Sequence, residues 1–270
     1  MRAVLGIDAA WTPNHPSGVA AATENLGGWQ LVGAASSYHR FEVLAGRSPG
    51  NEEITSGLLP NAPSLLVSAA VLSGCPIDLV AIDIPLSYSP IVGRRCADDA
   101  VSKAYGGRQC GTHTPSSLRP GPISDNLREA FKGLNYPLQT ERIEPPGIVE
   151  VYPHPALVEL SSASARLPYK FAKARKYWPT AVPSERRKRL YQEWKKIVAM
   201  LETKIAGVAK ALPELEATAT GTEVKACEDT LDAIICAWVA VCCLDGIAKP
   251  HGDKNAAIWI PTGISTIRAG

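Results

Sequence analysis

Two stretches, VLGIDAAW (Val4–Trp11) and LVAIDIP (Leu79–Pro85), decide how this 270-residue sequence folds. Each is a run of apolar residues that stops on an aspartate, Asp8 in the first and Asp83 in the second. Short apolar runs bounded by turn residues are typical of strands that are buried on both faces. The sequence therefore predicts two central strands that each end on a carboxylate.

The residues around the first stretch predict a group of three strands. The first strand covers Val4–Ala10, and Gly18–Glu24 and Gly28–Ser36 have the composition of two more. The segment Asn25–Gly28 between them is a typical hairpin turn. Three short strands in succession predict an antiparallel meander, and a fourth strand is expected over Ile77–Asp83.

The segments on either side of that fourth strand are less regular. Glu52–Ser73 has apolar residues at helical spacing, although Pro60 and Pro63 interrupt its first half. Ser89–Glu144 is rich in proline, glycine, arginine and serine, which favours long surface loops. We expect one short helix inside them, over Ala97–Tyr105.

The second half of the chain is predicted to be mostly helical. A strand over Gly147–Pro153 carries Glu150, and a long helix over Ser184–Leu212 begins with Ser184 as its N-cap. A second long helix is expected over Glu223–Leu244, and Ala256–Pro261 reads as a last strand.

This order of elements predicts an α/β fold of the RNase H-like type. Its mixed sheet would combine the three-stranded antiparallel meander with parallel strands, with helices on both faces. We expect a single domain over residues 1–270, with residues 155–222 as a helical insertion before the C-terminal helix. In this topology the first and fourth strands are neighbours, so that Asp8 and Asp83 would face one another.

Composition limits the class of protein but not its partner. With 46% hydrophobic and 20% charged residues, the chain can bury the core of one large globular domain. The net charge of +2 argues neither for nor against nucleic acid. The longest apolar run, Ala233–Leu244, is too short to span a membrane, and MRAVLGID has no room for a signal sequence. Adjacent Cys242 and Cys243 suit a buried helix rather than a disulfide framework, so we expect a cytoplasmic protein.

The acidic residues suggest a metal site. Two neighbouring carboxylates repel each other unless a proton or a metal ion neutralises them, and Mg2+ or Mn2+ prefers such oxygen ligands. Asp229 and Asp232 lie three apart on the last helix and can share one face. The alternative is that acids early in a helix, Glu228 above all, only complement its dipole. Glu150 could point to either face of its strand.

Several blocks of the sequence, in order, resemble one known family. They are GIDAAW, AIDIPLSYS, RRCADDA, VEVYPHPAL, the Tyr169-Lys170 pair, EDTLDAIICAWVA and AAIWIP. Together they look like the family catalogued as domain of unknown function 429, described as predicted nucleases of RNase H-like fold. The resemblance implies acidic site positions at Asp8, Asp83, Glu150 and Asp232, with Arg95 in the loop block. Asp229 and Asp232 also resemble the last two acids of Holliday-junction resolvases.

This resemblance implies a phosphodiesterase that acts on nucleic acid by two-metal hydrolysis. The expected metal ligands are Asp8, Asp83, Asp229 and Asp232. Glu150 would be a further ligand or would orient the attacking water. Two cations are candidates for contacts with substrate phosphate, namely Arg95 and Lys170. The basic run Arg186–Arg189 could contact a nucleic-acid backbone, but such runs are usually solvated helix faces.

Three other classes remain open. A non-catalytic nucleic-acid-binding or scaffold protein could retain the fold without turnover. An actin-like phosphotransferase needs a glycine-rich phosphate hairpin after the first aspartate, whereas this sequence has AAWTPNHPSG there. A zinc site at Cys96, Cys110 and His113 is conceivable, although their spacing matches no zinc-finger pattern.

Overall fold

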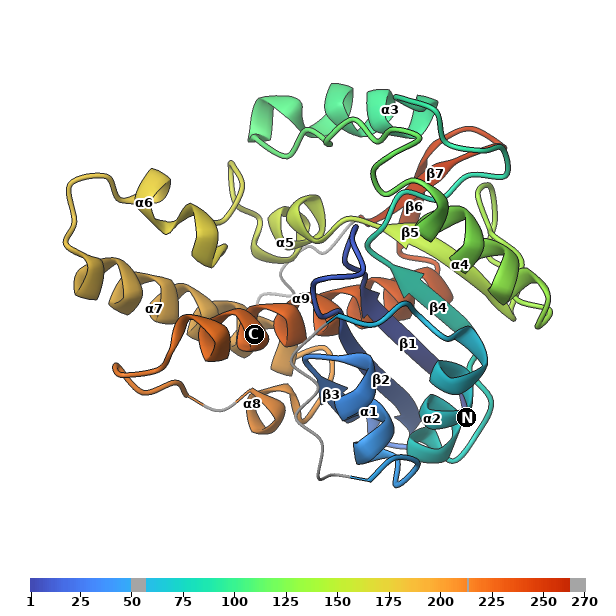
Figure 1. Ribbon diagram of the computed structural model, residues 1–270, viewed down its shortest axis with the longest axis horizontal. Helices are drawn as coiled ribbons and strands as arrows, with labels where there is room; N and C mark the ends of the chain where they lie inside the picture. Colours follow the sequence, from blue (N-terminus) through green and yellow to red (C-terminus); the bar gives the residue numbers. More distant parts are fainter. Residues whose placement is uncertain (50–56, 213, 263–270) are drawn as a thin grey trace, which may run out of the picture.

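A seven-stranded mixed sheet forms the centre of the computed structural model, which describes residues 1–49, 57–212 and 214–262 (Figure 1). The strand order is β3-β2-β1-β4-β5-β7-β6. Strands β1, β2 and β3 pair antiparallel, whereas β1, β4, β5 and β7 run parallel, and β6 returns antiparallel to β7. The strands are β1 (Ala3–Asp8), β2 (Gly18–Asn25), β3 (Gly28–Ala35), β4 (Leu79–Ile82), β5 (Gly147–Val151), β6 (Ala248–Gly252) and β7 (Ala257–Pro261). The predicted meander and its parallel continuation are thus confirmed.

Helices cover both faces of this sheet. On one face, α1, α2 and α4 pack against β1, β4 and β5, and on the other face α5, α7 and α9 enclose a second core. Helix α3 packs against β7 at the far edge of the sheet. The helices are α1 (Tyr38–Leu44), α2 (Ala62–Ser73), α3 (Cys96–Tyr105), α4 (Pro122–Lys132), α5 (Pro153–Ser161), α6 (Ala174–Tyr177), α7 (Pro183–Glu202), α8 (Val208–Ala211) and α9 (Gly221–Leu244).

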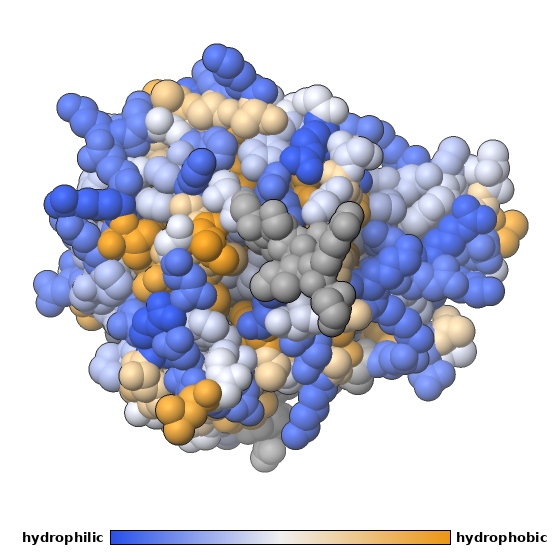
Figure 2. Space-filling model, turned by 180° about the vertical axis from the view of Figure 1, so that it is seen from behind, coloured by the Kyte–Doolittle hydropathy of each residue, from blue (hydrophilic) through white to orange (hydrophobic). Residues whose placement is uncertain are grey.

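The face of the molecule seen from behind is mostly polar, and the apolar side chains on it gather in small patches (Figure 2). Such scattered apolar residues are ordinary for a globular protein. None of the helices in the described part of the chain has the length and apolar character needed to cross a membrane.

Helix α2 is shorter than the predicted helix over Glu52–Ser73. Residues 52–56 of that prediction lie outside the described residues. The helix itself begins at Ala62, because the side chain of Asn61 caps it by accepting a hydrogen bond from the Ser64 backbone N–H. Pro63 falls in the first turn, where a proline is tolerated since no intrahelical donor is lost.

The predicted helix over Ser184–Leu212 was wrong at both ends. Helix α7 begins at Pro183, whose fixed φ suits the first helical position, and the N-cap is Val182 rather than Ser184. The helix ends at Glu202, and the chain turns through Gly207, which has a φ of 92°. The apolar spacing continued past this break because residues of the short α8 enter the same core.

Other elements were absent from the sequence prediction. The segment Ser89–Glu144 contains α4 as well as the expected α3, and α4 buries Leu127 and Phe131 against the sheet. Strand β6 is mostly exposed, so its residues lack the apolar pattern of a buried strand. The predicted helical insertion over residues 155–222 corresponds to a stretch that holds α6, α7, α8 and most of α5. That this stretch is an insertion into the domain stays a prediction.

Two glycines allow α9 to lie close to the sheet. A Cβ atom on Gly6 of β1 would lie 2.3 Å from the Ala233 carbonyl oxygen and 2.3 Å from the Ala237 nitrogen. A Cβ atom on Gly18 of β2 would lie 2.0 Å from the Asp229 carbonyl oxygen. These distances are far below van der Waals contact, so the absence of both side chains brings the acidic part of α9 to the end of β1.

Candidate functional site

Asp8 and Asp83 end two adjacent parallel strands in the same register. Ile7 of β1 pairs with Ile82 of β4, and the Asp83 backbone N–H donates to the Ile7 carbonyl at 2.9 Å. Neighbouring strands lie about 4.8 Å apart, so the two aspartates stand side by side. Ile7 and Ile82 both enter the core beneath α1 and α2. Side chains alternate along a strand, which directs both aspartates to the opposite face, where α9 lies.

Helix α9 brings three more acids to this place. A capping box between Thr220 and Glu223 fixes the start of the helix. Glu228, Asp229 and Asp232 follow on one side of it, each no more than 3% exposed. Asp8 and Asp83 are only partly buried, so the acidic cluster of these five residues is buried beneath α9 and accessible at the strand ends.

Two lysines and one tyrosine contact the helical acids. Lys170 donates to one oxygen of Asp232, and the Tyr169 hydroxyl donates to the other at 2.8 Å. Lys225 lies 3.0 Å from Glu228 and also donates to Asp229. Lys170 is 4.0 Å from Glu228. Two ammonium groups therefore face five carboxyl groups, which leaves an excess of negative charge.

The pKa values reflect burial together with this excess. Loss of hydration, followed by repulsion from Asp232, raises the pKa of Asp8 well above its usual range. Loss of hydration also raises the pKa of Asp83 to about 7 and that of Asp229 to about 6. Burial acts to lower the pKa of Lys170, but the attraction of Asp232, Asp8 and Glu228 outweighs it and raises that pKa. The cluster thus favours any added positive charge, whether a proton or a metal ion.

Glu150 does not join this cluster. It pairs with Ile82 in the sheet register, and its neighbours Val149 and Val151 enter the core on the α9 side. By alternation its carboxylate points to the other face of the sheet. The prediction that Glu150 lies with the other acids is therefore corrected. The sequence left open the face of the strand to which Glu150 points, and in the structure this is the face opposite the acidic cluster.

Arg95 likewise has a different position from the expected phosphate contact. Its guanidinium binds Glu150 through two hydrogen bonds of 2.6 and 2.8 Å, and it binds Asp98 at 2.9 and 3.0 Å. All three side chains are less than 10% exposed. Arg95 also donates to the Leu86 carbonyl, while Glu150 accepts from the Leu86 backbone N–H at 2.7 Å. This buried ion pair holds the segment that follows Asp83.

The acidic cluster has the donor chemistry for a hard divalent cation. Among the described residues, no side-chain hydrogen bond engages the carboxylates of Asp8 and Asp83, and one buried oxygen of Asp229, Oδ2, has no partner. Carboxylate oxygens are the ligands that Mg2+ and Mn2+ prefer. Within the same ranges, however, no three carboxylate, imidazole or thiol side chains are yet arranged to hold an ion. Lys170 and Lys225 occupy part of the available oxygen atoms.

The cysteines of the suggested zinc site have other surroundings. Cys96 is exposed, whereas Cys110 is buried and its thiol donates to the Arg108 carbonyl. Burial and the charges of Lys173 and Arg166 lower the pKa of His113, which indicates a cationic environment. Repulsion from such neighbours disfavours a bound cation at this place.

The sequence prediction missed three residues next to the cluster. Lys225 lies four residues before Asp229, and this helical spacing could have revealed it. The family resemblance includes Tyr169 but implies no role for it. His154, on α5, is 7% exposed, has no partner for Nδ1 among the described residues, and packs edge-on against Tyr169 with 5.3 Å between ring centroids. Burial, followed by repulsion from Lys170 and Arg166, lowers the pKa of His154 well below its usual range, so this ring is neutral.

The fold and the cluster define an α/β protein with carboxylates gathered at the ends of two parallel strands. Residues 6–257 match the family model described as Protein of unknown function (DUF429), so this chain belongs to that family. No curated protein and no solved structure gives a match. The family description assigns no activity, so function has to be argued from the cluster itself.

The raised pKa of Asp83 predicts how stability depends on pH in the absence of divalent metal. The folded-state pKa of about 7 exceeds the usual 3.8, so the folded protein binds the proton more tightly than the unfolded chain. The resulting stability is fully present below pH 4 and is lost as the pH rises through 7. We expect the Tm of the protein in EDTA to fall by at least about 3 °C between pH 5 and pH 8.

Thermal unfolding of Asp83→Asn provides the comparison, because this variant lacks the titrating group. Its Tm is expected to fall less over the same pH range than the Tm of the wild type. Asp99→Asn serves as the control, since the Asp99 side chain is 70% exposed and lies outside the acidic cluster. An equal fall in the wild type and Asp83→Asn would contradict the assignment.

Proposed function

We propose that this protein is a divalent-metal-dependent phosphodiesterase of RNase H-like fold, acting as a nuclease on DNA or RNA. The strand order β3-β2-β1-β4-β5, with an antiparallel meander followed by parallel strands, supports the proposed fold. The extra β7 and β6 extend the sheet beyond β5. The resemblance noted in the sequence supports the same class.

One observation carries the proposal. Asp8 and Asp83 stand side by side at the ends of β1 and β4, on the face where α9 presents Asp232. This arrangement concentrates negative charge at a partly accessible place. Such a concentration is energetically unfavourable unless a proton or a cation neutralises it. A pair of hydrated metal ions, or one ion, would both neutralise it and bind substrate phosphate.

The chain's own residues have distinct parts in this proposal. Asp8, Asp83, Asp229 and Asp232 would hold Mg2+ or Mn2+. Bound there, the metal would supply an activated water and neutralise charge on the phosphate. Lys170 keeps its proton because of its acidic neighbours and is 20% exposed, so it can donate to a phosphate oxygen.

In the proposal, the buried pair of Glu150 and Arg95 positions the segment that follows Asp83. Both side chains bind the backbone of Leu86, three residues after Asp83. Fixing this segment fixes the direction in which Asp83 leaves β4. Precise placement of ligands matters because small displacements in a catalytic site cost large factors in rate.

A cleavage assay tests the proposed function. Single-stranded, duplex, hybrid and branched nucleic acids are incubated with the protein and Mn2+, Mg2+ or EDTA. We expect cleavage only with metal, and we expect Asp8→Asn and Asp83→Asn each to lower the rate by about 10³ or more, since several kcal/mol of charge stabilisation depend on the metal.

The control for this assay is Asp99→Asn, which changes an exposed carboxylate on α3. Its rate should stay within about twofold of the wild type, as is usual for surface changes. Metal binding is measured alongside by calorimetry. Cleavage that persists equally in EDTA, or equally in Asp8→Asn and Asp83→Asn, would rule out the proposed site.

A second candidate is a nucleic-acid-binding protein of the same fold that performs no hydrolysis. The ion pairs of Lys170 with Asp232 and of Lys225 with Asp229 favour it, because they neutralise part of the cluster without metal. Such a protein would bind nucleic acid equally well in EDTA. It would also keep its affinity in Asp8→Asn and Asp83→Asn, with no cleavage under any condition.

A further inference from the structure

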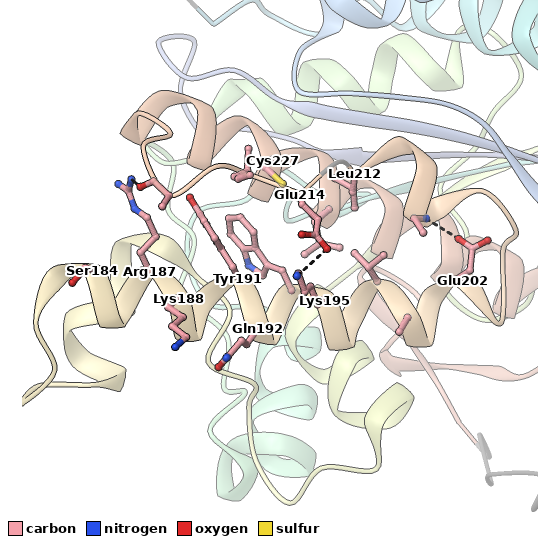
Figure 3. A pocket seen from close by; sticks show the side chains of 17 residues that line it. Ser184, Arg187, Lys188, Tyr191, Gln192, Lys195, Glu202, Leu212, Glu214 and Cys227 are labelled. Carbon is pink, nitrogen blue, oxygen red and sulfur yellow. Dashed lines mark hydrogen bonds and ion pairs between the residues drawn. The ribbon is translucent and has the colours of Figure 1, made fainter.

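A large pocket lies between α7, residues 209–212 and 214–217, and α9 (Figure 3). Its volume is about 1000 Å³. Small-molecule sites have volumes of roughly 300–1,000 Å³ and are mostly apolar with a few polar groups. The pocket is therefore large enough for a small-molecule ligand, and its lining decides which kind.

Most of the pocket wall is apolar. Trp194 and Val198 come from α7, Leu212 and Leu215 from the following segment, and Leu231 from α9. The indole N–H of Trp194 already donates to the Tyr169 carbonyl at 2.7 Å, so that Trp194 offers its ring rather than a donor. The ring of Tyr191 lies beside that of Trp194, with 5.7 Å between the centroids. Such walls suit an aliphatic or aromatic body.

One hydroxyl group in the pocket has no partner. The Tyr191 oxygen is shielded from water and makes no hydrogen bond to any described residue. Burial raises the pKa of this hydroxyl above its usual value, so the group stays protonated and remains a donor. An unpaired buried donor lowers stability, and an acceptor atom on a ligand would relieve that cost.

The charged groups of the pocket differ in how they are neutralised. Lys195 forms an ion pair of 2.8 Å with Glu214. Glu202 accepts hydrogen bonds from the backbone N–H groups of Gly207 and Ala209. Figure 3 shows the Lys195–Glu214 pair and one hydrogen bond to Glu202 at the pocket wall, and it shows Lys188 pointing away from the cavity. None of these four charged groups therefore presents a free charge to a ligand inside the pocket.

Arg187 is different. Its guanidinium donates to the carbonyl oxygens of Ala217 and Ala219, and within the described ranges no carboxylate neutralises it. Arg187 and Tyr191 are four residues apart on α7, which places them on the same side of the helix. In Figure 3 both extend from α7 towards the side where Cys227 lies. A positive charge and an unpaired donor thus lie next to an apolar cavity.

We propose that this pocket binds a small amphipathic anion, with an aliphatic or aromatic body and a carboxylate that pairs with Arg187 and accepts from Tyr191. The apolar wall takes the body of the ligand. The carboxylate satisfies the two groups that the protein leaves without an anionic or accepting partner. This binding is independent of the proposed nuclease activity.

Three probes that differ only in their head group test the sign of the charge. Octanoate, octanol and octylamine are compared as competitors of the fluorescent dye 8-anilinonaphthalene-1-sulfonate on the full chain. We expect octanoate to displace the dye at concentrations at least about tenfold lower than the other two, because a hydrogen-bonded charge pair is lost in both. Equal competition by all three, or no saturable binding, would overturn the proposal.

Two variants locate the binding. Arg187→Gln should weaken octanoate at least about tenfold and leave octanol unchanged. Arg186→Gln is the matched control, because Arg186 donates to the carbonyls of Trp178 and Pro179 and does not line the pocket. Tyr191→Phe should weaken octanoate severalfold and raise the Tm of the free protein. Unchanged octanoate affinity in both Arg187→Gln and Tyr191→Phe would place the ligand elsewhere.

Discussion

Replacing Gly6 by alanine is expected to destabilise the protein by about 3 kcal/mol. The new methyl group would lie 2.3 Å from backbone atoms of both Ala233 and Ala237, and a helix backbone cannot move aside as a flexible side chain can. Helix α9 must therefore move away from β1. Urea denaturation monitored by circular dichroism measures the loss as a lower midpoint with little change in slope.

Gly106→Ala is the matched control for this prediction. Gly106 has a φ of −60°, and a Cβ atom there meets nothing within 4 Å. Alanine at a compatible site reduces the entropy of the unfolded chain, so the variant should be as stable as the wild type or slightly more stable. A Gly6→Ala protein as stable as the wild type would show that α9 lies farther from the sheet than described.

Replacing Arg95 by methionine is expected to destabilise the protein by about 3–5 kcal/mol. The change leaves Glu150 and Asp98 buried without their common cation, and both are at most 3% exposed. The loss should decrease at low pH, where protonation removes the uncompensated charge. Thermal and urea unfolding at pH 7 and pH 4 measure both effects.

Arg94→Met gives the comparison at the neighbouring position. Arg94 pairs with Asp99, whose side chain is 70% exposed, and exposed pairs contribute about 0–1 kcal/mol. The Arg95 experiment also distinguishes a structural role of this residue from a contact with substrate phosphate. An Arg95→Met protein of unchanged stability but without cleavage would return Arg95 to the phosphate contact that the sequence predicted.

The sequence predicted the central sheet because its strands carry an unambiguous signal. β1 and β4 are buried on both faces, so their residues are almost continuously apolar, and their order along the chain limits the topology to a few choices. The neighbouring positions of Asp8 and Asp83 follow from that order. Elements with one exposed face or with prolines at their start, such as α4, α5 and β6, gave no comparable pattern.

The candidate site was predictable only in part, since side-chain direction depends on the exact register. Glu150 lies in the same kind of buried strand as Asp8, yet one residue of offset directs it to the other face and to Arg95. Lys170 and Asp232 are 62 residues apart, and their ion pair depends on how α9 docks on the sheet. No local pattern encodes such a contact.

Helix α9 contributes residues to three different regions of the molecule. Its residues Ala233 and Ala237 lie against β1, Asp232 belongs to the acidic cluster, and Leu231 forms part of the wall of the pocket. With 3.6 residues per turn, an inserted or deleted residue would turn all later positions by about 100°. The acidic cluster and the pocket therefore cannot evolve independently along this helix. Related chains should therefore carry no insertion within α9. The acidic cluster and the pocket each limit the substitutions that the other can accept.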